Sequence, residues 1–250
     1  MKFSILIPVY NSEKSIPKLV DEIRGFFSMR NESYEIVFVD DCSTDGSWAE
    51  IERMCAGFDQ IRGLHMDRNR GQQMALYWGL KYCEGDYAVT MDDDLQHDIL
   101  DLDLLIRCAE RGSDLVFGIY DAYGSNGIRS KGSSIVGHFF KKNYPNLNGR
   151  RVSSYRLIHK SVYQSLNQRE LDFVYLSAEL LIISKSVGNV FVKRRERQYG
   201  ESGYTLRKCV AIALKLNIYY GMPVLKHLRK VGTNETCVDG RCGKLSNQWD

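Results

Sequence analysis

The sequence predicts an α/β domain with a mostly parallel, Rossmann-like sheet, helices on both of its faces, and a helical extension at its C-terminal end. In the first half of the chain, short runs rich in β-branched and aromatic residues alternate with segments whose apolar residues recur at helical spacing. Parallel strands joined by crossover helices produce this alternation. A chain of 250 residues, 44% of them hydrophobic, is also long enough to bury a sizeable core.

Five strands are expected in the first half, because five short apolar runs are each bounded by polar or turn-forming residues. They cover residues 3–9, 36–39, 61–66, 87–91 and 115–118. In open sheets of this kind, ligands bind at the carboxyl ends of the strands. Polar residues follow the first, second and fourth strands, so we expect the functional site at this edge of the sheet.

Four helices are expected between and after these strands. The first is predicted to have Ser15 as its cap, Pro17 in its first turn and one apolar face, formed by Ile16, Leu19, Val20, Ile23 and Phe27. The second follows a turn in which Asp45 and Ser47 are suited to cap it. Its apolar residues are Trp48, Ile51 and Met54. The third covers residues 71–82, and the fourth is marked by Leu102, Leu105, Ile106 and Ala109.

Three consecutive carboxylates, Asp92, Asp93 and Asp94, directly follow the fourth strand. Like charges at this spacing repel one another, so we expect a hard divalent cation to neutralise them. If the alternation of the strand continues, Asp92, Asp94 and Gln96 converge on one side and Asp93 points away. Such oxygen ligands suit Mg²⁺ or Mn²⁺ bound together with substrate phosphates. The alternative interpretation is a solvated acidic turn.

Two common nucleotide-binding classes are excluded by the glycine pattern. The first strand-to-helix turn, residues 8–15, contains no glycine, and no Gly-Lys-Ser/Thr loop occurs in the chain. A dinucleotide-binding dehydrogenase and a P-loop enzyme are therefore not expected. A phosphatase that forms an aspartyl phosphate at Asp92 or Asp94 stays open, although such a nucleophile usually follows the first strand. A nucleotide-sugar-binding protein without turnover is the non-enzymatic alternative.

Four segments, in this order, resemble the family 2 glycosyltransferases of the GT-A fold. They are residues 8–11 (PVYN), 39–47 (VDDCSTDGS), 68–73 (RNRGQQ) and 91–97 (MDDDLQH). The last two are similar to those of polyprenyl-phosphate and dolichyl-phosphate sugar synthases, and the resemblance covers roughly residues 1–205. It implies an inverting transfer from a UDP- or GDP-type sugar donor. A divalent ion would stabilise the charge that develops on the departing nucleoside diphosphate.

The resemblance also implies roles for individual residues. The nucleoside pocket is expected to be lined by Pro8, Tyr10, Asn11 and Asp41, with Asp40 in support. Asp92, Asp94 and Gln96 would hold the metal, and Asp92 and Asp93 would lie against the donor. The segment from Asn69 to Gln73 would touch the donor sugar or phosphate, unless it only caps a helix. Three arginines that match phosphate-contacting positions are Arg129, Arg156 and Arg197.

The need for a general base depends on the acceptor. A sugar hydroxyl must lose a proton as it attacks, which requires a positioned acid such as Asp172 or Glu179. A lipid phosphate, with a second pKa of about 6, is largely ionised at neutral pH and can attack unaided. For both acids a structural ion pair or a charge on a helix face is the favoured interpretation. Glu179 in particular lies in an apolar run, where an unpaired charge is costly.

The chain departs from the lipid-linked subgroup in three respects. We find no paired membrane helices after the catalytic domain, Asp93 stands where alanine is common, and Asp98-Ile99-Leu100 replaces a proline-containing segment. The expected acceptor is therefore either a polyprenyl phosphate or a growing cell-surface glycan.

The C-terminal part is expected to be a basic amphipathic helical segment over residues 206–232, followed by a flexible tail over residues 233–250. Such a segment either lies on an anionic membrane or packs on the catalytic domain. The net charge of +3 is too small to indicate nucleic-acid binding. Without an export signal, and with seven cysteines that indicate reduced thiols, we expect a cytoplasmic protein, peripheral at most on the inner face of the plasma membrane.

Overall fold

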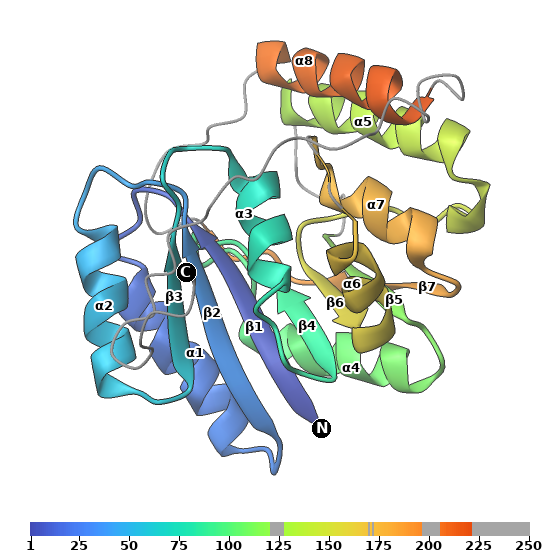
Figure 1. The fold of residues 1–250 in the computed structure, drawn as a ribbon. Coiled ribbons are helices and arrows are strands. Elements are labelled where there is room, and N and C mark those ends of the chain that lie inside the picture. Colours follow the sequence, from blue (N-terminus) through green and yellow to red (C-terminus); the bar gives the residue numbers. More distant parts are fainter. Residues whose placement is uncertain (121–127, 170, 172, 197–205, 222–250) are drawn as a thin grey trace.

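The computed structural model describes residues 1–120, 128–169, 171, 173–196 and 206–221, with only the backbone given for residues 128–135, 146 and 206–210. Its centre is a seven-stranded sheet in the order β3-β2-β1-β4-β6-β5-β7 (Figure 1). The strands are β1 (Lys2–Val9), β2 (Ser33–Asp40), β3 (Ile61–His65), β4 (Tyr87–Thr90), β5 (Leu115–Tyr120), β6 (Arg156–His159) and β7 (Val187–Val192). This confirms the predicted mostly parallel sheet.

Only β6 runs antiparallel to its neighbours among the described strands. It pairs with β4 on one side and β5 on the other, which are parallel to the rest of the sheet. Its register places Arg156 beside Thr90, the last residue of β4. Sequence analysis identified neither β6 nor β7, because these strands of four and six residues lie beyond the regular alternation of the first half.

Helices cover both faces of the sheet (Figure 1). They are α1 (Ile16–Ser28), α2 (Ser47–Gly57), α3 (Gln72–Leu80), α4 (Leu102–Glu110), α5 (Ile128–Asn143), α6 (Lys160–Asn167), α7 (Leu176–Ile183) and α8 (Leu206–Leu216). Short turns of other helix types precede α4 (η1, Ile99–Asp101), follow α5 (η2, Pro145–Leu147) and follow α8 (η3, Asn217–Gly221). The four helices expected from apolar periodicity are all present, and the third, predicted over residues 71–82, covers Gln72–Leu80.

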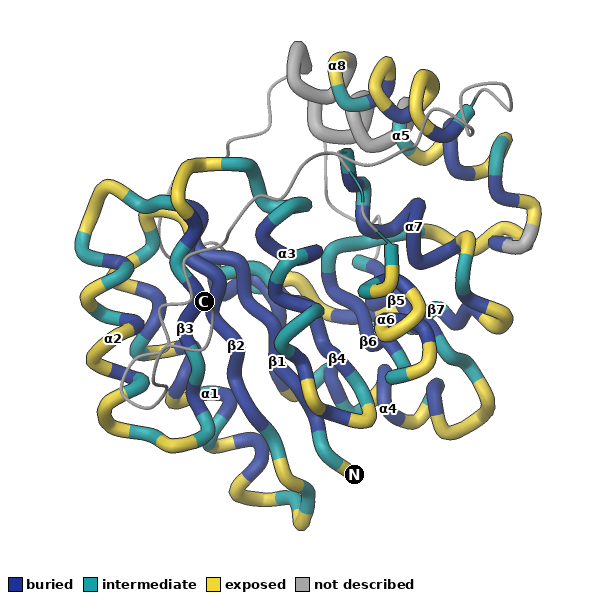
Figure 2. Tube along the Cα trace, viewed as in Figure 1, coloured by how far each residue is buried: buried dark blue, intermediate teal, exposed yellow. Residues whose placement is uncertain are grey.

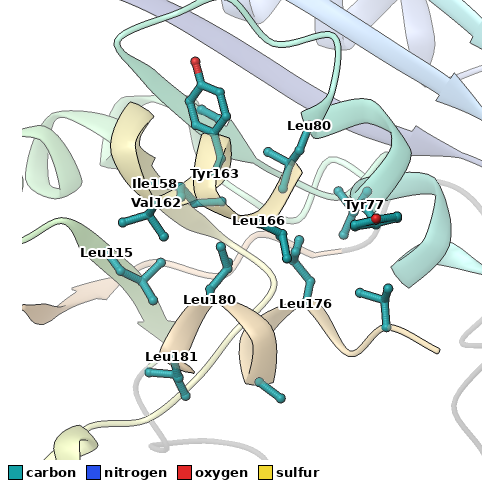
Figure 3. Packing of buried hydrophobic residues seen from close by; sticks show 14 of the residues in the cluster. Tyr77, Leu80, Leu115, Ile158, Val162, Tyr163, Leu166, Leu176, Leu180 and Leu181 are labelled. Atoms are coloured by element: carbon teal, nitrogen blue, oxygen red, sulfur yellow. The ribbon is translucent and has the colours of Figure 1, made fainter. Parts of the chain in front are cut away.

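The pleat of strand β1 separates two hydrophobic cores. Phe3, Ile5 and Ile7 of β1 belong to the cluster under α1, α2 and α4, whereas Leu6 belongs to the cluster under α3, α6 and α7. Figure 3 shows the second cluster, in which leucines of α7 meet those of α6 and α3. Burial of each such leucine contributes on the order of 2 kcal/mol to stability. The helices on both faces therefore stabilise the sheet that carries the loops at its edge.

The first helix begins where the sequence predicted, but its cap works differently. Ser15 occupies the cap position and Pro17 lies in the first turn. The Ser15 hydroxyl donates to the Ser12 carbonyl at 2.9 Å instead of accepting from the helix. Asp45 does act at the start of α2, because its carboxylate accepts from the backbone N–H of Ser47 at 2.9 Å.

The C-terminal helical layer consists of α8 packed on α5, at the upper edge of the molecule in Figure 1. Leu216 and Tyr220 are buried beneath it, while Leu214 and Ile218 are exposed. Figure 2 shows that α8 alternates between exposed and less exposed segments. The predicted segment 206–232 is therefore helical over its first part, and residues 222–232 and the predicted tail lie outside the described residues. No helix in the described ranges is long and apolar enough to cross a membrane.

Candidate active site

Three loops meet at the carboxyl ends of β1, β2 and β4, which lie side by side in the sheet. Each loop contains a non-glycine residue with a left-handed backbone: Asn11 at φ 53°, Cys42 at φ 58° and Leu95 at φ 59°. Such residues are uncommon and concentrate where the surrounding structure imposes a functional conformation. The expected rim of polar residues is therefore present, and its loops turn sharply at the strand ends.

The first two loops are joined by Asn11. Its side-chain oxygen accepts from the Thr44 N–H at 2.8 Å, and its own N–H donates to the Ser43 hydroxyl at 2.9 Å. Asn11 was predicted to contact the nucleotide; in the structure its hydrogen bonds connect the loop after β1 to the loop after β2. Beside it, Pro8 is buried in β1, while the Tyr10 side chain is 48% exposed and can offer a ring face to a ligand.

Asp40 is fully buried at the end of β2. One oxygen, Oδ2, accepts from the Ser43 N–H at 3.1 Å and contacts His65 Nδ1 at 2.8 Å. The other, Oδ1, is buried and has no hydrogen-bond partner within the described part of the chain. A buried acceptor in this state is costly unless a ligand or water satisfies it. Its position agrees with the supporting role expected for Asp40.

Asp41 connects β2 to the segment that precedes α3. Its two carboxylate oxygens accept from the N–H groups of Arg70 at 2.7 Å and of Gly71 at 2.8 Å. Burial raises the pKa of Asp41, and these two backbone hydrogen bonds counteract part of that effect. Gly71 has φ 86°, a conformation that favours glycine and turns the chain into α3.

Asp92 is held by three donors. Oδ1 accepts from Gln72 Nε2 at 2.6 Å, and Oδ2 accepts from the Ser154 hydroxyl at 2.8 Å and contacts His97 Nε2 at 3.2 Å. Burial acts to raise the pKa of Asp92, but contact with His97, the Ser154 hydrogen bond and the nearby Arg156 guanidinium outweigh it and lower the pKa to about 2. Asp92 is therefore an anion with a fixed orientation at neutral pH.

The expected convergence of Asp92, Asp94 and Gln96 rested on strand alternation, and that premise is wrong. Strand β4 ends at Thr90, so the acidic residues lie in a loop that Leu95 turns back into the core. Asp94 accepts from the Gln96 N–H at 3.1 Å. The Gln96 side-chain oxygen accepts from the Arg194 guanidinium at 2.6 Å, so in this arrangement it faces a cation of the protein.

Asp93 lies against the first loop, where its carboxylate accepts from the Tyr10 N–H at 3.2 Å. The pKa of Asp93 is raised to about 6, because burial and the charges of Asp92 and Asp94 together outweigh the hydrogen bonds from Ser12 and Tyr10, which lower it. Among the described residues, no three histidine, cysteine or acidic side chains gather as a preformed metal cluster. The acidic loop nevertheless concentrates carboxylates whose mutual repulsion a divalent cation would relieve.

The other predicted residues divide into three groups. Arg156 is almost fully buried in β6 and close enough to Asp92 to lower the pKa of that carboxylate. Glu179 is fully buried in α7 and forms an ion pair with Arg169, which favours its structural interpretation. Asp172, Arg197 and the Arg129 side chain lie outside the described residues.

The segment of residues 69–73, which was expected to touch the donor, contains one exposed residue and one that binds another helix. Asn69 is exposed, and the Gln73 oxygen accepts from the Leu176 N–H at 2.9 Å, which anchors α7 to α3. Sequence analysis did not single out Gln72, Ser154, His97 or Tyr120 as site residues. Gln72 and His97 belong to segments that it quoted, whereas Ser154 and Tyr120 carry no sequence signal, because only pairing of distant strands brings them close.

Comparison with known proteins places the chain in a well-populated group. The profile described as Glycosyl transferase family 2 matches residues 4–173. A relative from Edwardsiella ictaluri (strain 93-146), undecaprenyl-phosphate 4-deoxy-4-formamido-L-arabinose transferase, is 29% identical over 85% of this chain and 66% of its own length. The transferase of the same name from Serratia proteamaculans (strain 568) is 25% identical over 93% of this chain and 72% of its own. The chain thus spans about two thirds of the length of these relatives.

Two solved structures show the same fold. Glucosyl-3-phosphoglycerate synthase from Mycobacterium tuberculosis, in complex with Mn²⁺, UDP-glucose and phosphoglyceric acid, has a TM-score of 0.58 at 17% identity, over 86% of this chain and 79% of that one. S. aureus TarS 1-349 in complex with UDP-GlcNAc has a TM-score of 0.55 at 20% identity, over 87% of this chain and 67% of that one.

Proposed function

Because this chain belongs to glycosyl transferase family 2, as its sequence resemblance predicted, we propose that it transfers a sugar from a nucleotide-diphosphate donor to a polyprenyl phosphate. The names of the curated relatives, which are undecaprenyl-phosphate sugar transferases, support this acceptor. The UDP-sugars in the titles of the two solved structures support a donor of UDP type, with GDP as the alternative base.

One structural relationship carries the proposal. The three-residue segment Arg70–Gly71–Gln72 binds both acids of the site: its first two N–H groups hold Asp41, and the Gln72 amide holds Asp92. The segment therefore fixes the spacing between a carboxylate suited to a nucleoside base and one suited to the donor sugar or ribose. The alternative interpretation of the acidic run is a solvated acidic turn. Such a turn would not require hydrogen bonds from a distant segment to hold Asp92 at a fixed distance from Asp41.

A divalent cation fits the acidic loop, and we propose Mn²⁺ or Mg²⁺. A neighbouring structure contains Mn²⁺ together with UDP-glucose. Of the residues expected to bind it, Asp92 accepts from three donors of the protein, and Asp94 accepts from the Gln96 N–H within the acidic loop. Gln96 could contribute only after release from Arg194. The bound ion would act as a Lewis acid toward the diphosphate.

The chain's own residues would bind and orient the reactants. Tyr10 and Asp41 would hold the nucleoside, Arg156 would add positive charge next to Asp92, and Asp92 would orient the sugar. With a phosphate acceptor, which is mostly ionised at neutral pH, the attack requires no protein base. The buried ion pair of Glu179 with Arg169 agrees with such a mechanism, and inversion at the anomeric carbon would follow from a single displacement.

The C-terminal helical layer is proposed to contact the membrane that contains the acceptor lipid. Leu214 and Ile218 are 60% and 49% exposed on α8 and η3, and Lys215 lies between them. Lys141 and Lys142 are exposed on the neighbouring helix α5. Exposed apolar side chains flanked by lysines are the pattern that binds anionic interfaces. In this proposal residues 1–205 form the catalytic domain and residues 206–232 the membrane-contacting segment.

A donor and acceptor screen tests the proposed function. Purified protein is incubated with UDP- and GDP-sugars, Mn²⁺ and undecaprenyl phosphate, and release of nucleoside diphosphate is measured with and without the lipid. Lipid-dependent release with formation of a glycolipid is expected. Metal-dependent nucleotide binding without turnover under all conditions would instead identify a non-catalytic binding protein. Release of phosphate from simple monoesters would identify a phosphatase.

A further inference from the structure

We propose that His97 is a positioning residue whose imidazole fixes the orientation of the Asp92 carboxylate toward the donor. The inference rests on the proposed function, since it concerns the same site. His97 Nε2 lies 3.2 Å from Asp92 Oδ2, and the other ring nitrogen, Nδ1, lies 2.5 Å from the Tyr120 hydroxyl. Both polar atoms of the ring are therefore engaged, and one of them contacts the site directly.

The ionised Asp92 carboxylate can only accept, so the Nε2 atom that contacts it must carry a hydrogen. Burial raises the pKa of the Tyr120 phenol, and the charge of Asp92 adds to this effect. The phenol keeps its proton and can donate it to Nδ1, which lies within hydrogen-bond distance. A neutral imidazole that accepts at Nδ1 carries its hydrogen on Nε2, which can then donate to Asp92. In this arrangement Tyr120 donates to His97, and His97 donates to Asp92.

The surroundings hold the His97 ring still. Its side chain is 1% exposed, whereas that of Asp92 is 27% exposed. The ring packs on Tyr155 with centroids 4.7 Å apart and lies nearly parallel to Tyr120 at 5.7 Å. The backbone of His97 also forms a β-bridge to Arg194. The buried imidazole therefore contacts the carboxylate of a side chain that is itself partly open to solvent.

Packing alone does not require histidine at this position. An apolar side chain of similar volume would fill the space. It would, however, remove the hydrogen-bond partner that His97 provides to the Tyr120 hydroxyl and to Oδ2 of Asp92. Glutamine is the informative substitution, because its side-chain amide can place an N–H close to the position of Nε2. Leucine provides the matching variant that keeps the volume and removes the donor.

The kinetic experiment compares His97→Gln and His97→Leu with the wild type, using the full chain, a UDP-sugar, Mn²⁺ and undecaprenyl phosphate. Loss of an outer hydrogen bond to a catalytic group typically costs 10- to 100-fold. We expect His97→Leu to lower kcat/KM by about that factor, mainly through kcat, and His97→Gln to recover activity to within about fivefold of the wild type. His159 is the last residue of β6, at the end of the strand away from Arg156. The His159→Leu variant serves as the matched control.

A double-mutant cycle tests the link to Tyr120. Tyr120→Phe removes the donor to Nδ1 and should lower kcat/KM by about three- to tenfold in the wild type, on the scale of one hydrogen bond. In the His97→Gln background the same substitution should have little effect. Equal losses in both backgrounds, a His97→Gln variant as poor as His97→Leu, or a folded His97→Leu variant with wild-type kcat/KM would each overturn the proposal.

An NMR measurement separates this proposal from the proposed function. In protein labelled with ¹⁵N-histidine, His97 should show hydrogen on Nε2, and Tyr120→Phe should alter its signals. Hydrogen on Nδ1 would refute the positioning role even in an active enzyme. If the wild type transfers no sugar from any donor, the proposed function fails, and the tautomer then decides only whether the Tyr120–His97–Asp92 arrangement exists.

Discussion

Gln72 Nε2 lies 2.6 Å from Asp92 Oδ1, which joins the first residue of α3 to the acidic loop that follows β4. The two residues are 20 positions apart, and the hydrogen bond makes the orientation of the acidic loop depend on where α3 begins. Because the preceding two residues hold Asp41, a shift of this helix start would displace both acids together.

Gln72→Glu should therefore reduce activity strongly, although the two side chains are almost the same size. The substitution keeps the shape of the side chain but places a second carboxylate against Asp92. Loss of a hydrogen bond to a charged group costs about 1.5–3 kcal/mol, so we expect kcat/KM to fall at least tenfold. Gln164→Glu on the exposed surface of α6 makes the same charge change as a control. Equal activity of both variants would contradict a role for Gln72.

Asp94→Asn should abolish metal-dependent nucleotide binding while the protein remains folded. A neutral amide is a weaker ligand for a hard divalent cation than a carboxylate. Titration calorimetry with UDP and Mn²⁺ measures the binding, and circular dichroism checks the fold. Asp59→Asn, in an exposed turn, is the control. Unchanged Mn²⁺-dependent binding in Asp94→Asn would exclude this residue as a ligand.

Asp93→Asn should stabilise the protein at neutral pH. The folded-state pKa of Asp93 is raised from 3.8 to about 6, so the folded protein favours the protonated form. Stability from this group is present at low pH and is lost as the pH rises through about 6. About two pKa units correspond to at most roughly 3 kcal/mol, reduced by solvent that reaches the side chain. Asparagine removes this penalty and still accepts a hydrogen bond from Tyr10.

The pH dependence of that gain provides the measurement. Urea unfolding of the wild type and Asp93→Asn, without added metal, should show a larger difference at pH 7.5 and about half of it at pH 5. A gain that is the same at both values would mean that the carboxylate is not strained by its surroundings. Mn²⁺ should narrow the difference if it binds near this group.

Leu95 should reverse the usual order of alanine and glycine. Its side chain is 1% exposed and its backbone is left-handed, at φ 59°. Both small residues lose the buried side chain, at about 2–5 kcal/mol, but only glycine also removes the backbone strain of about 1–2 kcal/mol. Leu95→Gly should therefore be more stable than Leu95→Ala. At Leu102, with φ −57°, alanine should be the more stable of the two.

Vesicle binding tests the exposed face of α8 and η3. Leu214→Ser combined with Ile218→Ser should reduce co-sedimentation with vesicles that contain anionic lipid, and high salt should weaken binding of the wild type. Leu104→Ser on α4, where the leucine is 41% exposed, is the control. Unimpaired binding of the double variant would place any membrane contact elsewhere.

The sequence was sufficient for the first half of the fold, because strands that are buried on both faces and helices with one apolar face have regular patterns. It also located the rim, since Asp41 and Asp92 follow predicted strands. It was insufficient wherever long-range pairing decides the outcome. Ser154 reaches Asp92 across 62 positions of sequence, and the acidic loop departs from strand geometry because Leu95 is drawn into the core.

Strand β6 has a consequence for how this molecule comes into being during synthesis. A nascent chain that ends at Tyr120 already contains all three acid-bearing loops, but β4 and β5 have no direct contact until the strand Arg156–His159 enters between them. The same insertion delivers Ser154 and Arg156 to Asp92. The strand that joins β4 to β5 is thus also the one that brings these two groups to the acidic loop.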